Sequence, residues 1–335
     1  MFERYIPRNL CREYAEFNFP HPTSFIAVVK GIKPLMSIFV RYDKYKKLER
    51  ICKKYGLFIT HNKYFLETPT ASYLRRAKRN SDQSVIKYLT GHTTTKSIAF
   101  PTNNPQKTRT VQVFISKSKR LVKDALKFGW TTTVIDKYFV PFDLINMLNF
   151  GELLGYPDCC VKFFCTKLMD TEVGARKPYI IYKNTKGKPS FYCNNNLHLL
   201  AHLSRYSLIW HFPCSFDCRK TIRNSKKLLD VIREEEPEYA EKIEYYLKLP
   251  LLVFRDRRVM AFEGSMKGRK ITYSDCIFGG LTQPIDETKI YKFRWFKEGD
   301  MVEVTKNEIL IFKEGKLLHS IRREDESFGF PLKFY

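Results

Sequence analysis

The chain has 335 residues, of which 44% are hydrophobic and 15% aromatic, and this is enough to bury the cores of two or three domains. Its longest apolar runs are far too short to span a bilayer, and none follows the charged N-terminal segment, so we expect a cytoplasmic protein without a membrane partner. The formal net charge is +24, and residues 1–150 hold 27 Lys and Arg against 10 Asp and Glu. This excess favours nucleic acid as the partner, although basic composition also serves solubility alone.

The N-terminal part reads as two strand-helix-strand units about 73 positions apart. Glycines follow both predicted helices, as is typical of helix ends. The identity between the units is thin, and generic composition explains it as well as duplication does. The predicted elements are Ser37–Val40, Asp43–Tyr55 and Leu57–Thr60 in the first unit, and Val111–Ile115, Lys117–Phe128 and Thr131–Ile135 in the second.

Basic side chains of this part are the candidates for binding nucleic-acid phosphates. They lie on the two predicted helices and in a polar segment between the units, although a run of charges is more often only a solvated face. The candidates are Lys46, Lys47, Arg50, Arg75, Arg76, Lys78, Arg79, Lys119, Arg120 and Lys123.

From Phe142 the pattern becomes helical, and after Pro250 it changes to short strands and hairpin turns. The chain is therefore predicted to be an α+β protein with a basic α/β domain at 1–141, a helical cysteine-rich domain at 142–249 and a small β domain at 250–335. The predicted central helices are 143–154, 157–168, 197–210, 215–235 and 237–247. The predicted strands are 251–254, 259–262, 271–273, 291–296, 301–304, 309–312 and 317–321.

Six of the nine cysteines fall within 60 positions of the central part. Four of them occur in two short segments, Gly155-Tyr156-Pro157-Asp158-Cys159-Cys160 and His211-Phe212-Pro213-Cys214-Ser215-Phe216-Asp217-Cys218. In each segment a proline and a small polar residue stand where a helix begins, and unpaired N–H groups there favour thiolates. Because disulfide frameworks belong mostly to small secreted domains, we expect metal binding or catalysis at these thiols.

The predicted metal ligands are Cys159, Cys214 and Cys218, and His211 completes a tetrahedron if the metal is zinc. Adjacent side chains on a helix diverge by about 100 degrees, so only one of Cys159 and Cys160 is expected to be a ligand. The geometry does not decide which one, and Cys160 is taken as the spare, catalytic thiol. The thiols are compatible with an iron-sulfur cluster, with a zinc ion and with metal-free redox chemistry. Tyr156, Asp158, Ser215 and Asp217 are expected to orient the thiols by hydrogen bonds, and Cys193 and Cys276 are further candidates for a fourth ligand.

The two segments resemble an uncharacterised archaeal and bacterial family marked by a GYPxCC motif and a downstream PCSxxC motif. Both motifs are intact here, and the resemblance covers the chain from Phe150 to Lys227. The resemblance implies no particular reaction, and the basic N-terminal half lies outside it.

Together these features predict an iron-sulfur or metal-dependent protein that acts on RNA, with tRNA modification or sulfur transfer as the reaction. The alternatives are a non-enzymatic nucleic-acid-binding protein with a structural zinc site, and a metal-free thiol-redox protein that uses Cys159 and Cys160. Vicinal disulfides are strained, which lowers the weight of the redox alternative.

Overall fold

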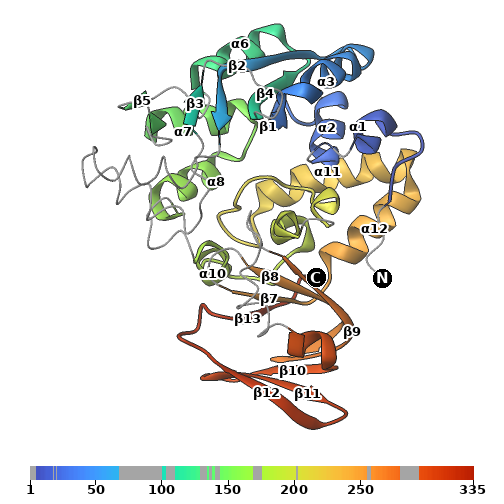
Figure 1. Ribbon diagram of the computed structural model, residues 1–335, viewed down its shortest axis with the longest axis vertical. Helices are drawn as coiled ribbons and strands as arrows, with labels where there is room; N and C mark the ends of the chain where they lie inside the picture. Colours follow the sequence, from blue (N-terminus) through green and yellow to red (C-terminus); the bar gives the residue numbers. More distant parts are fainter. Residues whose placement is uncertain are drawn as a thin grey trace. The chain divides into compact units, whose positions relative to one another are not determined.

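The computed structural model of the chain contains two compact units, each with helices and strands (Figure 1). Unit 1 comprises Met1–Tyr5, Glu172–Lys226 and Pro237–Tyr335, and unit 2 comprises Ile6–Thr171 and Lys227–Glu236. The structure describes residues 5–17, 19, 21–67, 100–102, 110–128, 134–135, 138–139, 144–168, 176–200, 203–254, 258–279 and 294–335. The predicted α+β class is confirmed, and the three predicted domains stay a prediction.

Unit 2 contains a four-stranded antiparallel sheet with the strand order β1-β4-β2-β3. Strand β4 pairs with both β1 and β2, so the two strands that flank helix α3 in sequence lie on either side of β4. The elements are α1 (Arg12–Glu16), α2 (Pro22–Val29), β1 (Leu35–Arg41), α3 (Tyr42–Lys54), β2 (Phe58–Glu67), β3 (Phe100–Thr102), β4 (Thr110–Ser116), α6 (Lys119–Phe128), β5 (Val134–Ile135), β6 (Tyr138–Phe139), α7 (Leu144–Leu153), α8 (Asp158–Phe163) and a π-helical turn, Phe164–Leu168.

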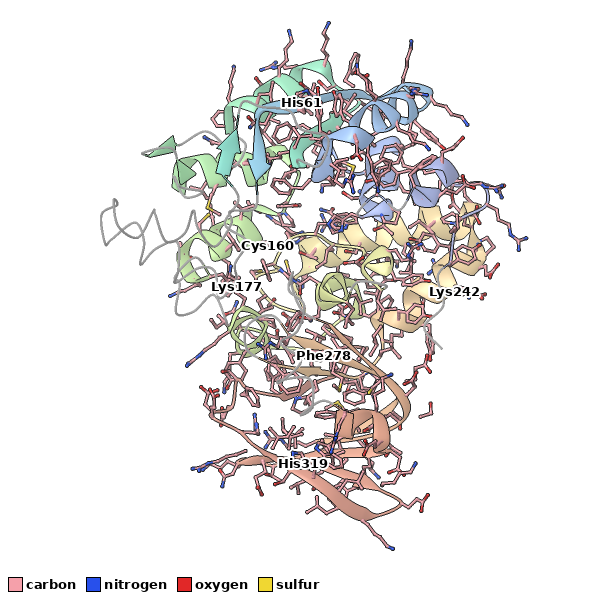
Figure 2. The ribbon with its side chains drawn as sticks, viewed as in Figure 1. His61, Cys160, Lys177, Lys242, Phe278 and His319 are labelled. Carbon is pink, nitrogen blue, oxygen red and sulfur yellow. The ribbon has the colours of Figure 1, made fainter. Side chains whose placement is uncertain are left out.

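Helices α3 and α6 cover opposite faces of this sheet. His61 on β2 is paired with Val113 on β4, and its ring (labelled in Figure 2) lies 4.8 Å from the ring of Tyr45 on α3. The next residue of β4, Phe114, points to the other face because side chains alternate along a strand. There Phe114 packs in one core cluster with Val122 of α6.

Unit 1 is built on a seven-stranded antiparallel sheet with the order β12-β11-β10-β9-β8-β7-β13. The turn between β11 and β12 is Glu314-Gly315, where both residues have positive φ (50° and 76°), the geometry that suits a two-residue hairpin. The elements are α10 (Lys177–Lys183), 3₁₀ turns at Phe191–Cys193, Asn196–Leu199 and Ser204–Tyr206, α11 (Arg219–Glu235), whose second half belongs to unit 2, α12 (Pro237–Leu247), β7 (Leu251–Val253), β8 (Val259–Lys267), β9 (Lys270–Gly279), β10 (Met301–Val304), β11 (Glu308–Lys313), β12 (Lys316–Arg322) and β13 (Phe330–Leu332).

Two element predictions are wrong. In place of a helix at 197–210, the structure has two short 3₁₀ turns, and the chain from Arg205 to Ile209 is buried. An apolar run without a polar face does not specify a helical period. In place of a strand, residues 294–298 form a helical turn that buries Phe296 in the core of the sheet, where its carbonyl accepts a hydrogen bond from Tyr273 (2.8 Å). The helical turn allows the ring of Phe296 to reach the core, and this burial outweighs the local strand pattern of residues 294–296.

Within the described residues, no helix combines the length and the apolar character that crossing a bilayer requires.

The bulge between β8 and β9 depends on a glycine, and this yields a stability prediction. A Cβ on Gly264 would lie 2.0 Å from the carbonyl oxygen of Thr272 and 2.6 Å from the Cα of Tyr273. Gly264→Ala should therefore lower the free energy of unfolding by about 3 kcal/mol or more, measured by urea denaturation. The control is Gly268→Ala, where nothing lies within 4 Å and only the positive φ of 60° costs about 1 kcal/mol. Equal losses in the two variants would contradict the backbone clash.

Candidate metal centre

The first cysteine pair lies at the start of α8, and close backbone approaches fix this helix start. Gly155 has φ +71°, and a Cβ there would lie 2.5 Å from the Cδ of Pro34. Pro157 is the N-cap of α8, and its carbonyl accepts hydrogen bonds from the N–H groups of Cys160 (2.9 Å) and Val161 (3.0 Å). A Cβ on Gly151 of α7 would lie 2.8 Å from a methyl group of Val161. Only glycine at both positions leaves room for this packing.

The second pair lies on a loop that a neighbouring segment, residues 184–190, holds by hydrogen bonds. The side-chain amide of Asn184 donates to the carbonyl of Cys214 (2.7 Å), and the N–H of Phe216 donates to the hydroxyl of Thr185 (2.9 Å). The ring of Phe216 is buried, and its carbonyl accepts a hydrogen bond from the N–H of Ser190 (2.8 Å). The backbone from Cys214 to Cys218 is therefore fixed from outside the motif.

Asp217 anchors the same loop through its carboxylate. The Oδ2 atom accepts hydrogen bonds from the N–H groups of Gly187 (2.7 Å) and Lys186 (3.2 Å). Burial opposes the ionised form, but hydrogen bonds from Ser215, Gly187 and Lys186 outweigh it, so the pKa of Asp217 lies below the ordinary value for aspartate. Asp217 is a charged brace that holds the loop bearing Cys214 and Cys218.

Cys218 occupies the position before the first turn of α11. Its carbonyl accepts the hydrogen bond of the N–H of Ile222 (2.9 Å), the first bond of the helix. Its side chain therefore lies next to the helix N-terminus, which favours a thiolate. The buried thiol of Cys193 lies 3.8 Å from the carbonyl of Cys218, and burial raises the pKa of Cys193.

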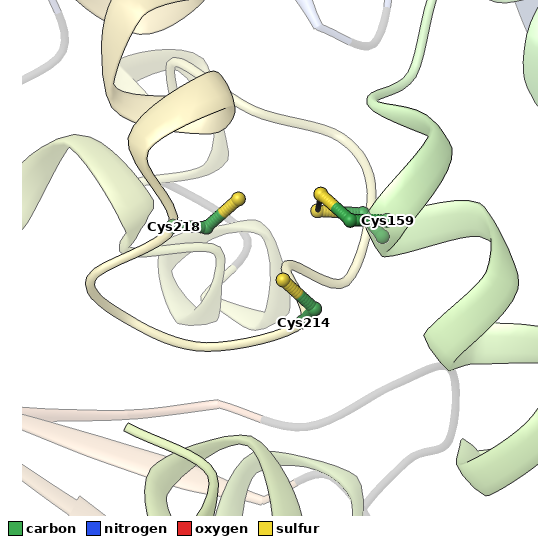
Figure 3. Close-up of side chains that lie close together, drawn as sticks. Cys159, Cys214 and Cys218 are labelled. Carbon is green, nitrogen blue, oxygen red and sulfur yellow. Dashed lines mark hydrogen bonds between the residues drawn. The ribbon is translucent and has the colours of Figure 1, made fainter. Parts of the chain in front are cut away.

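Four sulfur atoms come together from the two segments. The Sγ atoms of Cys159, Cys160, Cys214 and Cys218 all lie within 4.8 Å of one another, with Cys160 and Cys218 buried. The Sγ atoms of Cys159 and Cys160 are 3.9 Å apart. Figure 3 shows the side chains of Cys159, Cys214 and Cys218 pointing toward a common space. This group of four cysteines, called the thiol cluster below, could hold a metal ion.

The dimensions of the thiol cluster suit one ion. Bonds of about 2.3 Å from a tetrahedral zinc ion place its four sulfur ligands about 3.8 Å apart. The 3.9 Å separation of Cys159 and Cys160 is already close to this value, and the upper limit of 4.8 Å requires contraction of no more than about 1 Å. The residues therefore fit a tetrathiolate site.

Three of the four metal ligands predicted from sequence belong to the thiol cluster, and the fourth does not. Cys159, Cys214 and Cys218 are brought together, and Cys160, predicted as a spare thiol, joins them. Although adjacent Cβ atoms diverge on a helix, the rotamers of Cys159 and Cys160 bring their Sγ atoms back toward each other. His211 is not in the group; its Nε2 atom lies within hydrogen-bonding distance of the hydroxyl of Thr221 (3.0 Å).

The residues predicted to orient the thiols lie in different surroundings. Ser215 and Asp217 belong to the loop that carries the second pair, whereas Asp158 is exposed in the first turn of α8. The ring of Tyr156 lies 5.0 Å from the Nζ atom of Lys33, and burial raises the pKa of Tyr156. The sequence reasoning missed Asn184, Thr185 and Gly187, because Asn-Thr-Lys-Gly signals only a turn.

The predicted phosphate-binding residues do not form one surface. The side chains on α3 and those on α6 are exposed, but the two helices cover opposite faces of the sheet. The members on α3 are Lys46, Lys47 and Arg50, those on α6 are Lys119, Arg120 and Lys123, and Arg75, Arg76, Lys78 and Arg79 lie outside the described residues.

Comparison of the chain with protein-family models, with curated proteins and with solved structures finds no match. The resemblance based on the GYPxCC and PCSxxC motifs stays a prediction.

Removal of the Asp217 brace should weaken metal binding. Asp217→Ala deletes the two backbone hydrogen bonds to the 184–190 segment, so the affinity for zinc should fall 10- to 100-fold in competition with a chromophoric chelator. The matched control is Asp230→Ala, which removes an exposed carboxylate of α11 paired with Arg233. An unchanged zinc affinity in Asp217→Ala would show that the loop is held without this carboxylate.

Lys33, beside Tyr156, gives unit 2 a pH-dependent stability. Burial lowers the pKa of Lys33 to about 7, so between pH 7 and 10 the unfolded chain binds a proton that the folded chain has lost. Stability should rise with pH over this range, by on the order of 4 kcal/mol relative to Lys33→Met. Urea denaturation of both proteins at pH 7 and pH 10 measures the difference. A difference that stays constant with pH would contradict the buried, titrating ammonium.

Proposed function

We propose that the thiol cluster binds a single metal ion, that this ion is zinc, and that the protein is a zinc-containing RNA-binding protein. The observation that carries the first part is the mutual distance of at most 4.8 Å between the four sulfur atoms. In this proposal Cys160 is the fourth ligand, and Cys159, Cys214 and Cys218 are the other three.

The size of the thiol cluster favours one ion over an iron-sulfur cluster. A [4Fe–4S] cube lies between its four cysteine sulfurs and holds them at the corners of a much larger tetrahedron. Two adjacent cysteines with sulfur atoms 3.9 Å apart match two corners of a single-ion site instead. A mononuclear iron site would have similar dimensions, and metal analysis distinguishes iron from zinc.

Four protein thiolates favour a structural role for the metal over a catalytic one. Catalytic zinc keeps an open position for water or substrate, whereas closed tetrathiolate sites stabilise the fold. The two ligand segments are more than 50 residues apart in sequence, and such a link between distant segments is what structural zinc supplies. The enzymatic alternatives, RNA modification and sulfur transfer, would need a ligand to leave the metal.

RNA is proposed as the partner because the positive charge favours an anionic polymer. The net charge of +24 attracts polyanions, and release of counterions from a phosphate backbone turns that attraction into affinity. The RNA part of the proposal rests on this charge, and measurement of RNA binding by the full-length chain tests it.

Metal analysis of the purified chain tests the metal part. We expect one zinc per chain with neither iron nor acid-labile sulfide, and near-complete loss of zinc in Cys160→Ser and Cys214→Ser. Cys165→Ser is the matched control, because this half-buried cysteine lies outside the thiol cluster. His211→Ala should also retain zinc. Iron with labile sulfide in the wild-type protein, or full zinc content in Cys160→Ser, would contradict the proposed site.

A further inference from the structure

Positive charge is concentrated in the segment that carries the second cysteine pair. Residues 173–229 hold eleven Lys and Arg and a single acidic residue, Asp217. The net charge of the whole C-terminal half does not reveal this positive segment, because acidic residues elsewhere in that half offset its charge. The carboxylate of Asp217 is engaged by backbone N–H groups of the 184–190 segment. Two of the cations, Arg176 and Lys183, pair with Asp325 (3.4 Å) and Glu326 (3.6 Å). Asp217 and these two pairs balance only part of the positive charge of the segment.

Part of this charge lies along one face of α11. Arg219, Lys220, Arg223 and Lys226 are exposed, and at 100 degrees per residue they fall within one stripe of the helix. Thr221 and Ser225, which are buried, define the opposite side. The stripe, called the α11 stripe below, begins at the residue after Cys218.

The α11 stripe opposes the ordinary charge preference of a helix. The N-terminal end carries partial positive charge, so acidic residues are favoured there and cations are unfavourable by a few tenths of a kcal/mol to about 1 kcal/mol each. The first turn of α11 has no acidic residue. Departures from such local rules are expected at functional sites. Cations at the N-terminal end of α11 would be stabilised by an anion bound from outside the chain.

Some exposed cations on α3 and α6 form ion pairs within the described part of the chain, and others, such as Arg50 and Lys123, form none. On α3, Lys46 pairs with Glu49 (3.3 Å), and on α6, Arg120 pairs with Asp124 (3.6 Å). Within the part of the chain that the structure describes, Arg219, Arg223 and Lys226 form no ion pair. Their charges are therefore available to an anionic partner without loss of an internal bond.

We propose that the α11 stripe is the surface that binds the phosphate backbone of RNA, next to the cysteine loop. This rests on the proposed function and adds the surface on which it acts. The side-chain cations supply the affinity, and the charge complementarity is to a row of phosphates rather than to a single anion. We expect the cations on α3 and α6 to contribute less to RNA affinity, because these helices lie on opposite faces of the four-stranded sheet of unit 2.

Two triple variants of the full chain test the proposal. One is Arg219→Gln, Arg223→Gln and Lys226→Gln, and the other, which removes the same charge from α3, is Lys46→Gln, Lys47→Gln and Arg50→Gln. The probe is a fluorescein-labelled 20-nucleotide single-stranded RNA of mixed sequence, titrated at several salt concentrations. Loss of three phosphate contacts should lower the affinity about 100-fold at 0.1 M salt and flatten the salt slope by about 2. The α3 variant should lose no more than a few-fold.

The possible results distinguish a failure of the α11 surface from a failure of the proposed RNA-binding function. If the wild-type chain does not bind the RNA, the RNA part of the proposed function fails. If it binds and the α3 variant loses as much affinity as the α11 variant, the α11 surface is overturned alone. Loss of zinc from the α11 variant would assign its cations to compensation of the thiolates and overturn the proposal. DNA of the same sequence that binds as tightly as the RNA would overturn the choice of RNA.

Discussion

The mutual approach of four sulfur atoms is the constraint on which the interpretation of this protein depends. Two thiolates 4 Å apart repel each other by about 4 kcal/mol at an effective dielectric constant of about 20. Four cysteine sulfurs within 4.8 Å, two of them buried, can therefore coexist only as protonated thiols or around a cation. A tetrahedral ion turns the repulsion into bonding. The 3.9 Å separation of Cys159 and Cys160 is close to the spacing that such an ion imposes, and the other separations lie within about 1 Å of it.

Most of the local structure near the thiol cluster serves to fix the cysteine backbone. Gly151 and Gly155 permit close packing at the start of α8, and Asn184, Thr185 and Asp217 hold the loop of the second pair. None of these residues supplies a sulfur ligand. They reduce the conformational freedom that binding of a metal ion would otherwise have to remove, as residues around metal sites ordinarily do. The site is thus specified by more sequence than its two motifs.

The sequence predicts the location of the site better than its ligand set. Proline, glycine and cysteine spacing identified both segments, and the mixed class follows from periodicity. The inclusion of Cys160 could not be predicted, because it depends on side-chain rotamers that helix periodicity does not determine. His211 had suitable chemistry but lies against Thr221. The turn at 294–298 depends on burial of Phe296, and the separation of α3 from α6 depends on strand register. Both are tertiary properties that a local pattern does not contain.

The most direct test of the central claim is X-ray absorption spectroscopy at the metal edge of the purified full-length chain. A single zinc ion in the thiol cluster predicts four sulfur neighbours at about 2.3 Å and no second metal nearby. A nitrogen or oxygen neighbour in place of one sulfur would remove Cys160 from the ligand set. A metal-metal distance typical of an iron-sulfur cluster would contradict the single-ion site altogether.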